Sequence, residues 1–409
     1  MSQPHSPITA SETPEAVVRQ RPSSSIPLRI FAVCLTSVLV AVNYTNYGPL
    51  IPSLHSELHI SNGEAGLFST LLFLGLAVAY IPAGILADRY GSRPILLGSS
   101  LIFVFGELLL PLFPNLIWML ACRAILGFGS GAAFVAGARV AASLGKHSSL
   151  GQGLYGGSVQ VGSGIGLLVT PLLLVWFGWQ GAFFVWGLAG ISSIVVWLFV
   201  NEAQEPREAT RADVGAGLRS PSIWTLGLSH MGTFGLGNTI AAWIAIYLVH
   251  QYGLTLGLAA TLGSVALLTG MFFRPLGGIL IGRGIIGAIP LLRLGTVFGF
   301  LGLFLLALPL SFAPLVIAGM GLIAIGATIP YTSVFNEAAH LRGVSKGIGQ
   351  ALVSVISIPT VLLGPPLIGF LFQQTGSFTP AFASILLFSA VAVTASFLAG
   401  PAVKRETTA

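Results

Sequence analysis

Gly84-Ile85-Leu86-Ala87-Asp88-Arg89-Tyr90-Gly91-Ser92-Arg93 is a short charged segment between two long apolar runs, 64–87 and 94–113. A helix needs about 20 apolar residues to cross the hydrocarbon core of a membrane, and both runs reach this length. Charged residues inside that core are costly and rare. The segment therefore predicts a tight turn that joins two membrane-spanning helices at one membrane surface.

The same pattern returns 194 residues later in the chain. Gly84-Ile85-Leu86 corresponds to Gly278-Ile279-Leu280, and Arg89 corresponds to Arg283. The same offset relates three further pairs: Ile60-Ser61 with Leu254-Thr255, Gly153 with Gly347, and Pro171 with Pro365. Such a parallel repeat is the organisation of transporters whose two bundles rock about a site at their interface.

The composition places most of the surface in lipid. Of the 409 residues, 54% are hydrophobic and 7% are charged, whereas a soluble domain carries about 25% charged residues. We predict an all-α membrane protein with twelve transmembrane helices in two six-helix bundles related by a parallel repeat. The expected helices lie near 28–52, 64–87, 94–113, 115–143, 151–176, 181–200, 222–249, 256–281, 287–310, 314–338, 347–372 and 378–400.

The polar segments between these runs predict the domains and the orientation. We expect a disordered cytoplasmic tail at 1–27, an N-terminal bundle at 28–200, a cytoplasmic linker at 201–221, a C-terminal bundle at 222–400 and a cytoplasmic tail at 401–409. The positive-inside rule predicts a multi-pass inner-membrane protein with both termini cytoplasmic. This orientation rests on basic residues that all fall in loops on the same side of the membrane: Arg89, Arg93, Lys146, Arg207, Arg211, Arg219, Arg283, Arg293, Arg342, Lys346, Lys404 and Arg405.

Several functional classes find no support in the residues. The net charge of +6 does not indicate nucleic-acid binding, because the basic residues lie singly or in pairs between apolar runs. Cys34 and Cys122 lie inside apolar runs, so we expect neither a disulfide nor a metal site. No Walker loop, Ser-centred elbow or His/Asp cluster indicates an enzyme, and we expect no cofactor.

The segment from Gly84 to Arg93 resembles the loop signature of the major facilitator superfamily, G-x-L-A-D-R-x-G-R-R, with Ser92 as the one departure. The resemblance implies that Gly84, Asp88, Arg89 and Arg93 form a gate that locks the cytoplasmic helix ends in the outward-open state. Asp88 would pair there with a cation such as Arg139. The alternative is a solvated turn that only fixes topology. In the second half Gly282 replaces the acid, which predicts a weaker second gate.

Glu107 and Arg123 are ionisable residues inside apolar runs, and their distances from the turn between these runs match. We therefore predict that they pair. One interpretation is a structural ion pair within one bundle; the other is that Glu107 accepts a proton and Arg123 modulates it. Arg123-Ala-Ile-Leu-Gly127 resembles the helix 4 motif R-x-x-x-G, which is linked to proton coupling in the superfamily.

Arg274 lies near the membrane midplane, about 13 Å along its helix from Arg283. It has no acid near its depth in its own half, and such a guanidinium attracts an anionic ligand. The alternative is an arginine bonded to backbone carbonyls of broken helices. The stretch Phe273-Arg274-Pro275-Leu276-Gly277-Gly278 resembles helix 8 of nitrate/nitrite porters. The second arginine of that family is replaced here by Tyr80, and a single helix 8 arginine resembles monocarboxylate and oxalate transporters.

Polar residues in other apolar runs are candidates for lining the same site: Asn43, Tyr44, Tyr47, Gln160, Asn238 and Tyr331. Taken singly, each also suits interhelical hydrogen bonding. His230, near the cytoplasmic end of its run, is expected to be interfacial, as are His55, His59 and His250.

The leading functional hypothesis is a secondary active transporter for a small anion, either a monocarboxylate or a nitrate- or nitrite-like ion, driven by proton symport or exchange. Its expected partners are the anion, protons and the lipid bilayer, and we expect a monomer. The alternative is a proton-coupled exporter of neutral or cationic drugs or metabolites. The exporter signature G-P-x-x-G-G is absent, since helix 5 carries Gly162-Ser-Gly-Ile-Gly166. A membrane sensor or scaffold would need neither the gate motif nor the midplane cations.

Overall fold

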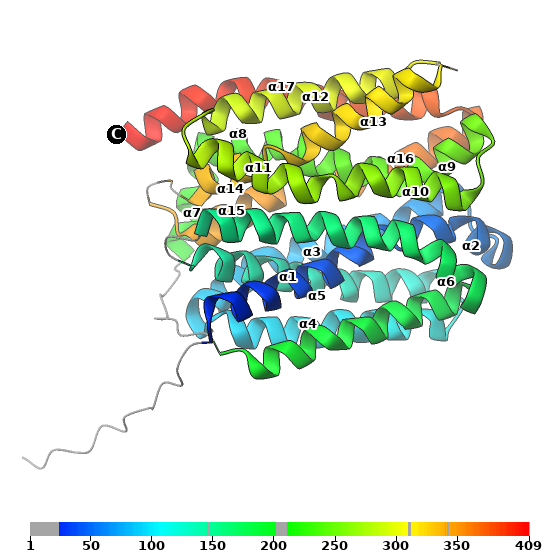
Figure 1. The fold of residues 1–409 in the computed structure, drawn as a ribbon, viewed down its shortest axis with the longest axis horizontal. Helices are drawn as coiled ribbons and strands as arrows, with labels where there is room; N and C mark the ends of the chain where they lie inside the picture. Colours follow the sequence, from blue (N-terminus) through cyan, green and yellow to red (C-terminus); the bar gives the residue numbers. More distant parts are fainter. Residues whose placement is uncertain are drawn as a thin grey trace, which may run out of the picture.

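A computed structural model describes residues 24–144, 148–201, 211–309, 312–339, 341 and 343–408. Regular structure in these ranges is helical (Figure 1). Lys146, Arg207, Arg342 and most of the expected tail at 1–27 and linker at 201–221 lie outside the described residues, as do the side chains of Arg211, Lys346, Lys404 and Arg405.

The N-terminal half contains six membrane crossings. Gly178 breaks helix α6 with a φ of 68°, so this 52-residue element makes two crossings, as predicted. The helices are α1 (Ile26–Thr45), α2 (Ile51–Leu58), α3 (Asn62–Tyr90), α4 (Ser92–Leu109), α5 (Leu116–Ala142) and α6 (Ser148–Phe199).

The C-terminal half also makes six crossings, several of them interrupted. The helices are α7 (Arg211–Arg219), α8 (Pro221–His230), α9 (Leu236–Tyr252), α10 (Leu256–Leu268), α11 (Gly270–Gly282), α12 (Ala288–Ala307), α13 (Ala313–Thr328), α14 (Tyr331–Ala339), α15 (Lys346–Ile356), α16 (Pro359–Thr375) and α17 (Phe378–Thr408). A π-helical turn, Met231–Gly235, separates α8 from α9. The sequence predicted neither these interruptions nor the short helix α7, which lies in the expected linker.

Equivalent contacts in the two halves confirm the repeat. Ser61 accepts a hydrogen bond from Glu64 N at the start of α3, and Thr255 accepts one from Leu258 N at the start of α10. Arg93 in the first turn of α4 and Arg293 in α12 also make matching contacts, although the offset of 194 does not relate them. Arg93 donates to the carbonyls of Trp197 and Leu198 near the end of α6. Arg293 donates to those of Ser396 and Phe397 in α17.

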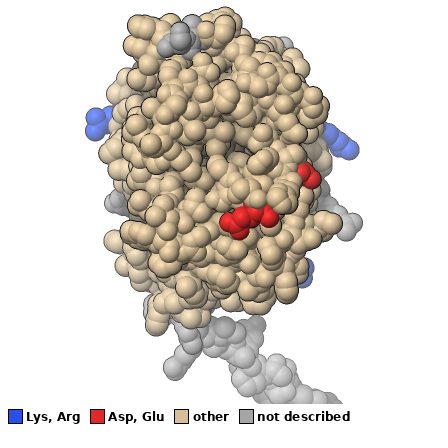
Figure 2. All heavy atoms as spheres, turned by 90° about the vertical axis from the view of Figure 1, so that its right-hand side faces the viewer, with Lys and Arg blue, Asp and Glu red and all other residues tan. Residues whose placement is uncertain are grey.

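The two ends of the molecule differ in charge. We call them the Arg89 end, after a residue in the last turn of α3, and the His55 end, after a residue in α2. Figure 2 shows the His55 end with acidic side chains on its face, while blue side chains project only at the distant rim. The acids in α2 and in the first turn of α3 are Glu57 and Glu64. This asymmetry follows the pattern of basic residues on which the predicted orientation rests.

Glycines let helices of the N-terminal half approach backbone to backbone. A side chain at Gly127 of α5 would overlap the carbonyl of Leu72 in α3. A Cβ atom added at Gly75 of α3 would likewise overlap the backbone of Ala124 and Phe128. Such contacts supply the van der Waals packing on which helix association in lipid depends.

We expect Gly127→Leu to lower the free energy of unfolding by about 1–3 kcal/mol or more, because α3 and α5 would have to separate. The matched control is Gly98→Leu, since a Cβ atom added at Gly98 of α4 would meet no other atom within 4 Å. Thermal unfolding of both variants in the same detergent measures the difference. Equal melting temperatures would contradict the inferred backbone contact.

Candidate functional site

Arg274 lies in α11, buried between the two halves, with 2% of its surface exposed. Its Nη1 donates a 2.6 Å hydrogen bond to the carbonyl of Gly156, in α6 of the other half. The guanidinium lies over the ring of Tyr331, 4.3 Å from its centroid. Its Nε finds no hydrogen-bond partner among the described residues. The side chain is thus held in orientation with part of its hydrogen-bonding capacity unused.

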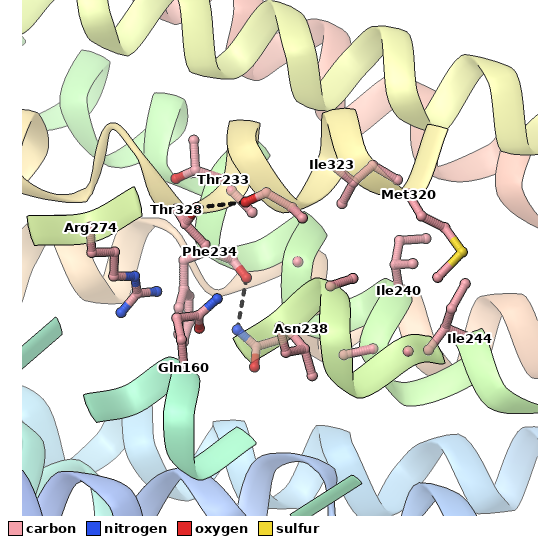
Figure 3. Close-up of a pocket in the computed structure, with 17 residues that line it drawn as sticks. Gln160, Thr233, Phe234, Asn238, Ile240, Ile244, Arg274, Met320, Ile323 and Thr328 are labelled. Atoms are coloured by element: carbon pink, nitrogen blue, oxygen red, sulfur yellow. Dashed lines mark hydrogen bonds between the residues drawn. The ribbon is translucent and has the colours of Figure 1, made fainter. Parts of the chain in front are cut away.

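A cavity of about 40 Å³ adjoins Arg274 at the interface of the halves (Figure 3). Gln160 contributes to its wall from the N-terminal half. Thr233 and Phe234 belong to the π-helical turn, a feature that is frequent at functional sites. Asn238 and Thr328 complete the polar wall, and each donates to the carbonyl four residues earlier in the chain, Phe234 O and Ala324 O.

The cavity has one polar end and one apolar end. In Figure 3, Arg274 and Gln160 lie at one end, and Ile240, Ile244 and Met320 lie at the other. Because α9, α11 and α13 all contribute, the lining depends on how these helices rotate about their axes. An unpaired cation beside an apolar wall can hold a ligand that carries one negative charge.

None of the predicted tyrosines lines this cavity, although Tyr44 and Tyr331 pack beside residues that do. The hydroxyls of Tyr44 and Tyr331 are buried and have no hydrogen-bond partner in the described part of the chain. Tyr44 packs on Phe234, with ring centroids 6.5 Å apart. Tyr80 instead packs on Phe134 and lines a smaller neighbouring cavity, away from the lining that Arg274 shares.

The expectation that His230 is interfacial was wrong. This residue is buried at 3% exposure, and its ring stacks on Phe234 with centroids 5.5 Å apart. It also contacts Tyr331 and Phe335, and its Nδ1 lies 2.8 Å from Thr233 Oγ1. His230 is the last residue of α8, about 14 Å along the helix from Pro221, so it lies deeper than its position in the apolar run suggested.

Glu107 and Arg123 do not form the predicted direct ion pair. Asn46 bridges them: its Nδ2 donates to Glu107 Oε1 at 2.7 Å, and its Oδ1 accepts from Arg123 Nη1 at 3.3 Å. Arg123 also donates to the carbonyls of Phe68 and Asn43. The two residues lie close enough to share one partner, but the side chain of a third helix occupies the space between them.

Two other predicted residues belong to this network. The Asn43 side chain donates to Leu39 O and accepts from Asn46 Nδ2. The Tyr47 ring centroid lies 5.2 Å from the guanidinium carbon of Arg123. Asn43 and Tyr47 therefore lie in the N-terminal bundle, outside the lining of the Arg274 cavity.

Asp88 forms an ion pair with Arg139 at the Arg89 end, with Oδ1 2.6 Å from Nε. Ser92 accepts a hydrogen bond from the same guanidinium. Across the interface, a Cβ atom at Gly347 of α15 would lie 3.3 Å from Asp88 Oδ2, and one at Gly84 would lie 3.8 Å from Gly347 O. The predicted pair is thus placed against the start of a helix from the other half, whose dipole favours negative charge.

The sequence prediction missed Asn46, Thr233, Phe234 and Thr328. The sequence did contain a signal for Asn46, because it lies one helical turn after Asn43 in the same apolar run. Thr233 and Phe234 face the cavity because the π-helical turn rotates their side chains relative to a regular helix. No residue pattern in the sequence predicts that turn.

Two bundles of membrane-spanning helices, with a charged cavity at their interface, define the class of membrane transport proteins. Residues 33–360 match the family described as Major Facilitator Superfamily, and the chain belongs to this family. A solved bacterial homologue of the human lysosomal transporter Spinster, in an inward-facing and occupied conformation, has the same fold. Its TM-score is 0.70 at 18% identity, covering 94% of this chain and 99% of that one.

Two curated relatives are named for transport or extrusion. A Bacillus subtilis protein named nitrite extrusion protein is 26% identical over 348 residues, covering 82% of this chain and 85% of that protein. Probable anion transporter 6, chloroplastic, of Arabidopsis thaliana is 27% identical over 270 residues, covering 58% of this chain. The match spans 52%, or about half, of the length of the Arabidopsis protein.

We expect Asn46→Leu to destabilise the protein, because both bridging hydrogen bonds disappear at a buried charged pair. Each buried polar group left unpaired costs about 1–3 kcal/mol. Thermal unfolding in detergent measures this loss. Asn238→Leu is the control, since the Asn238 side chain bonds only to a backbone carbonyl four residues earlier, Phe234 O, and to no charged group. A smaller loss for Asn46→Leu than for the control would argue against the bridge.

Proposed function

We propose that the protein is a secondary active transporter that moves a small monoanion by alternating access, with Arg274 as the anion-binding residue. The observation that carries this proposal is a buried guanidinium with no acidic partner among the described residues, beside a cavity at the interface of the halves. The names of the two curated relatives, one an anion transporter and one a nitrite extrusion protein, support the same conclusion.

Burying a charge away from water has a large free-energy cost. An arginine inside the membrane is expensive unless it finds a partner of opposite charge. Here Gly156 and Tyr331 supply one hydrogen bond and one ring face, neither of which neutralises the charge. A carboxylate, nitrate or nitrite ion would do so and would use the free donors of the planar fork.

Alternating access needs contacts between the halves that can open at either end. At the Arg89 end, Gly153 lies against Pro275, and Gly347 lies against Asp88. At the His55 end, Gly66 lies against Pro366 and Gly48 against the Ala242 carbonyl. We propose that the Asp88 contact is a gate, with Gly84 allowing close approach, Arg139 holding the carboxylate, and Arg89 and Arg93 as basic residues beside it.

We also propose that the Asn46-bridged network couples transport to protons. Glu107 is 1% exposed and its Oε2 has no hydrogen-bond partner among the described residues. A carboxyl group in that position can bind and release a proton when the halves move. Anion exchange without protons is the competing mechanism. The proposed setting is the inner membrane, with the Arg89 end and both termini cytoplasmic and the chain a monomer.

We expect Arg274→Gln to lower uptake of the transported anion into liposomes by about 30-fold or more, because the ligand loses its charge partner. Glutamine keeps a neutral polar side chain at this depth but is two atoms shorter than arginine, so the bond from Nη1 to Gly156 O is lost as well. Thermal unfolding of the variant in detergent checks that the fold is retained. The uptake assay tests nitrate, nitrite, cyanate and short monocarboxylates, with empty liposomes as the blank. Arg283→Gln, exposed on the turn directly after α11, is the control and should transport normally.

Transport that survives Arg274→Gln would make this arginine structural. Uptake or efflux of cationic dyes without any anion flux would instead favour the exporter of neutral or cationic compounds.

We expect Glu107→Gln to remove the acceleration of anion uptake by an imposed pH gradient. Asn46 can still donate to the amide oxygen, so the fold is retained while the titratable charge is lost. Anion exchange measured without a gradient should persist in this variant. A full response of the variant to the pH gradient would rule out Glu107 as the coupling residue.

A further inference from the structure

A second, larger cavity of about 410 Å³ lies beside the first, between α10, α11 and α13. Its wall is apolar and includes Leu262, Val265 and Ile317, whose side chains are 42–66% exposed on the outer surface. These helices cross the membrane, so the cavity is a cleft that opens toward lipid. We call it the α10–α13 cleft.

The two cavities share part of their lining. Ala266, Met320 and Ala324 border both the Arg274 cavity and the α10–α13 cleft. In Figure 3, Met320 lies at the end of the Arg274 cavity opposite the guanidinium. The polar end of the Arg274 cavity, its apolar end and the α10–α13 cleft therefore lie in that order.

The equivalent helices of the N-terminal half pack more closely. Gly129 of α5 packs on α4, and Gly326 of α13 packs on α12, which aligns α5 with α13. Two residues earlier stand Gly127 in α5 and Ala324 in α13. Gly127 touches the backbone of α3, whereas Ala324 borders the cleft. A Cβ atom added at Gly321, which also lines the cleft, would meet no other atom within 4 Å.

We propose that the transported anion carries an apolar chain, with its charged group on Arg274 and its chain passing Met320 into the α10–α13 cleft. This inference rests on the proposed anion transport and narrows it to amphipathic monoanions. The apolar end of the Arg274 cavity gives such a chain its first contacts, and the cleft provides room for the remainder. Burial of each methylene group from water would strengthen binding by up to about fourfold.

Binding of alkanesulfonates tests the proposal, because the sulfonate stays charged and does not cross the bilayer as a neutral acid. Methanesulfonate, butanesulfonate and octanesulfonate are titrated calorimetrically into the full chain in nanodiscs, with empty nanodiscs as the blank. We expect octanesulfonate to bind about tenfold tighter than methanesulfonate, or more. Arg274→Gln should weaken binding of all three probes.

Two matched variants separate the cleft from the charge. Gly321→Leu places a side chain inside the cleft and narrows it, which should weaken binding of octanesulfonate by about tenfold while leaving binding of methanesulfonate unchanged. Gly98→Leu adds the same side chain at an open position of α4 and should change neither.

The outcomes distinguish the two proposals. Equal affinity for short and long sulfonates, with loss in Arg274→Gln, would keep anion binding and overturn the amphipathic substrate. Chain-length dependence that survives Gly321→Leu would overturn the role of the cleft and point to lipid partitioning or another path. Affinities that are unchanged in Arg274→Gln would overturn both proposals, and so would the absence of binding by any probe.

Discussion

Every backbone polar group inside a membrane needs a partner within the protein, and this constraint decides where the chain can depart from a regular helix. Departures are tolerated where they are buried or line a cavity. Three interruptions of the C-terminal half meet this condition at one place. The π-helical turn Met231–Gly235, the junction at Thr269 and the end of α13 at Thr328 all contribute to the Arg274 cavity or the adjoining cleft.

The two halves have the same topology but use it differently. The N-terminal half packs α3 against α5 through glycines, and its buried charges are bridged internally by Asn46. The C-terminal half leaves a cleft between α10 and α13 and leaves Arg274 without a counter-charge among the described residues. Small residues decide the packing in one half, and broken helices create the space in the other.

The sequence predicted the fold well because its decisive signals are local. The length of an apolar run fixes a crossing, and the recurrence of Gly84-Ile85-Leu86 at Gly278-Ile279-Leu280 fixes the repeat. The midplane position of Arg274 was inferred from the same spacing, and a charge at that depth must be shielded from lipid. Contacts between helices were predicted less well. Sequence spacing placed Glu107 and Arg123 at the same depth in the membrane. It could not predict that the Asn46 side chain lies between them, because that depends on how the helices are rotated about their axes.

The bond between Arg274 and Gly156 joins the two halves at the centre of the molecule. Gly156 also lies against the Tyr331 ring, where any side chain would collide, so one backbone position in α6 receives both the cation and the aromatic ring of the other half. A rocking motion that separates α6 from α11 must break these contacts and leave the guanidinium with fewer partners. A ligand can shift such an equilibrium only by its differential affinity for the two states. The proposed anion on Arg274 would provide that difference, because it would compensate the charge most strongly when the halves exclude water. Substrate recognition and closure of the bundles would therefore depend on the same arginine.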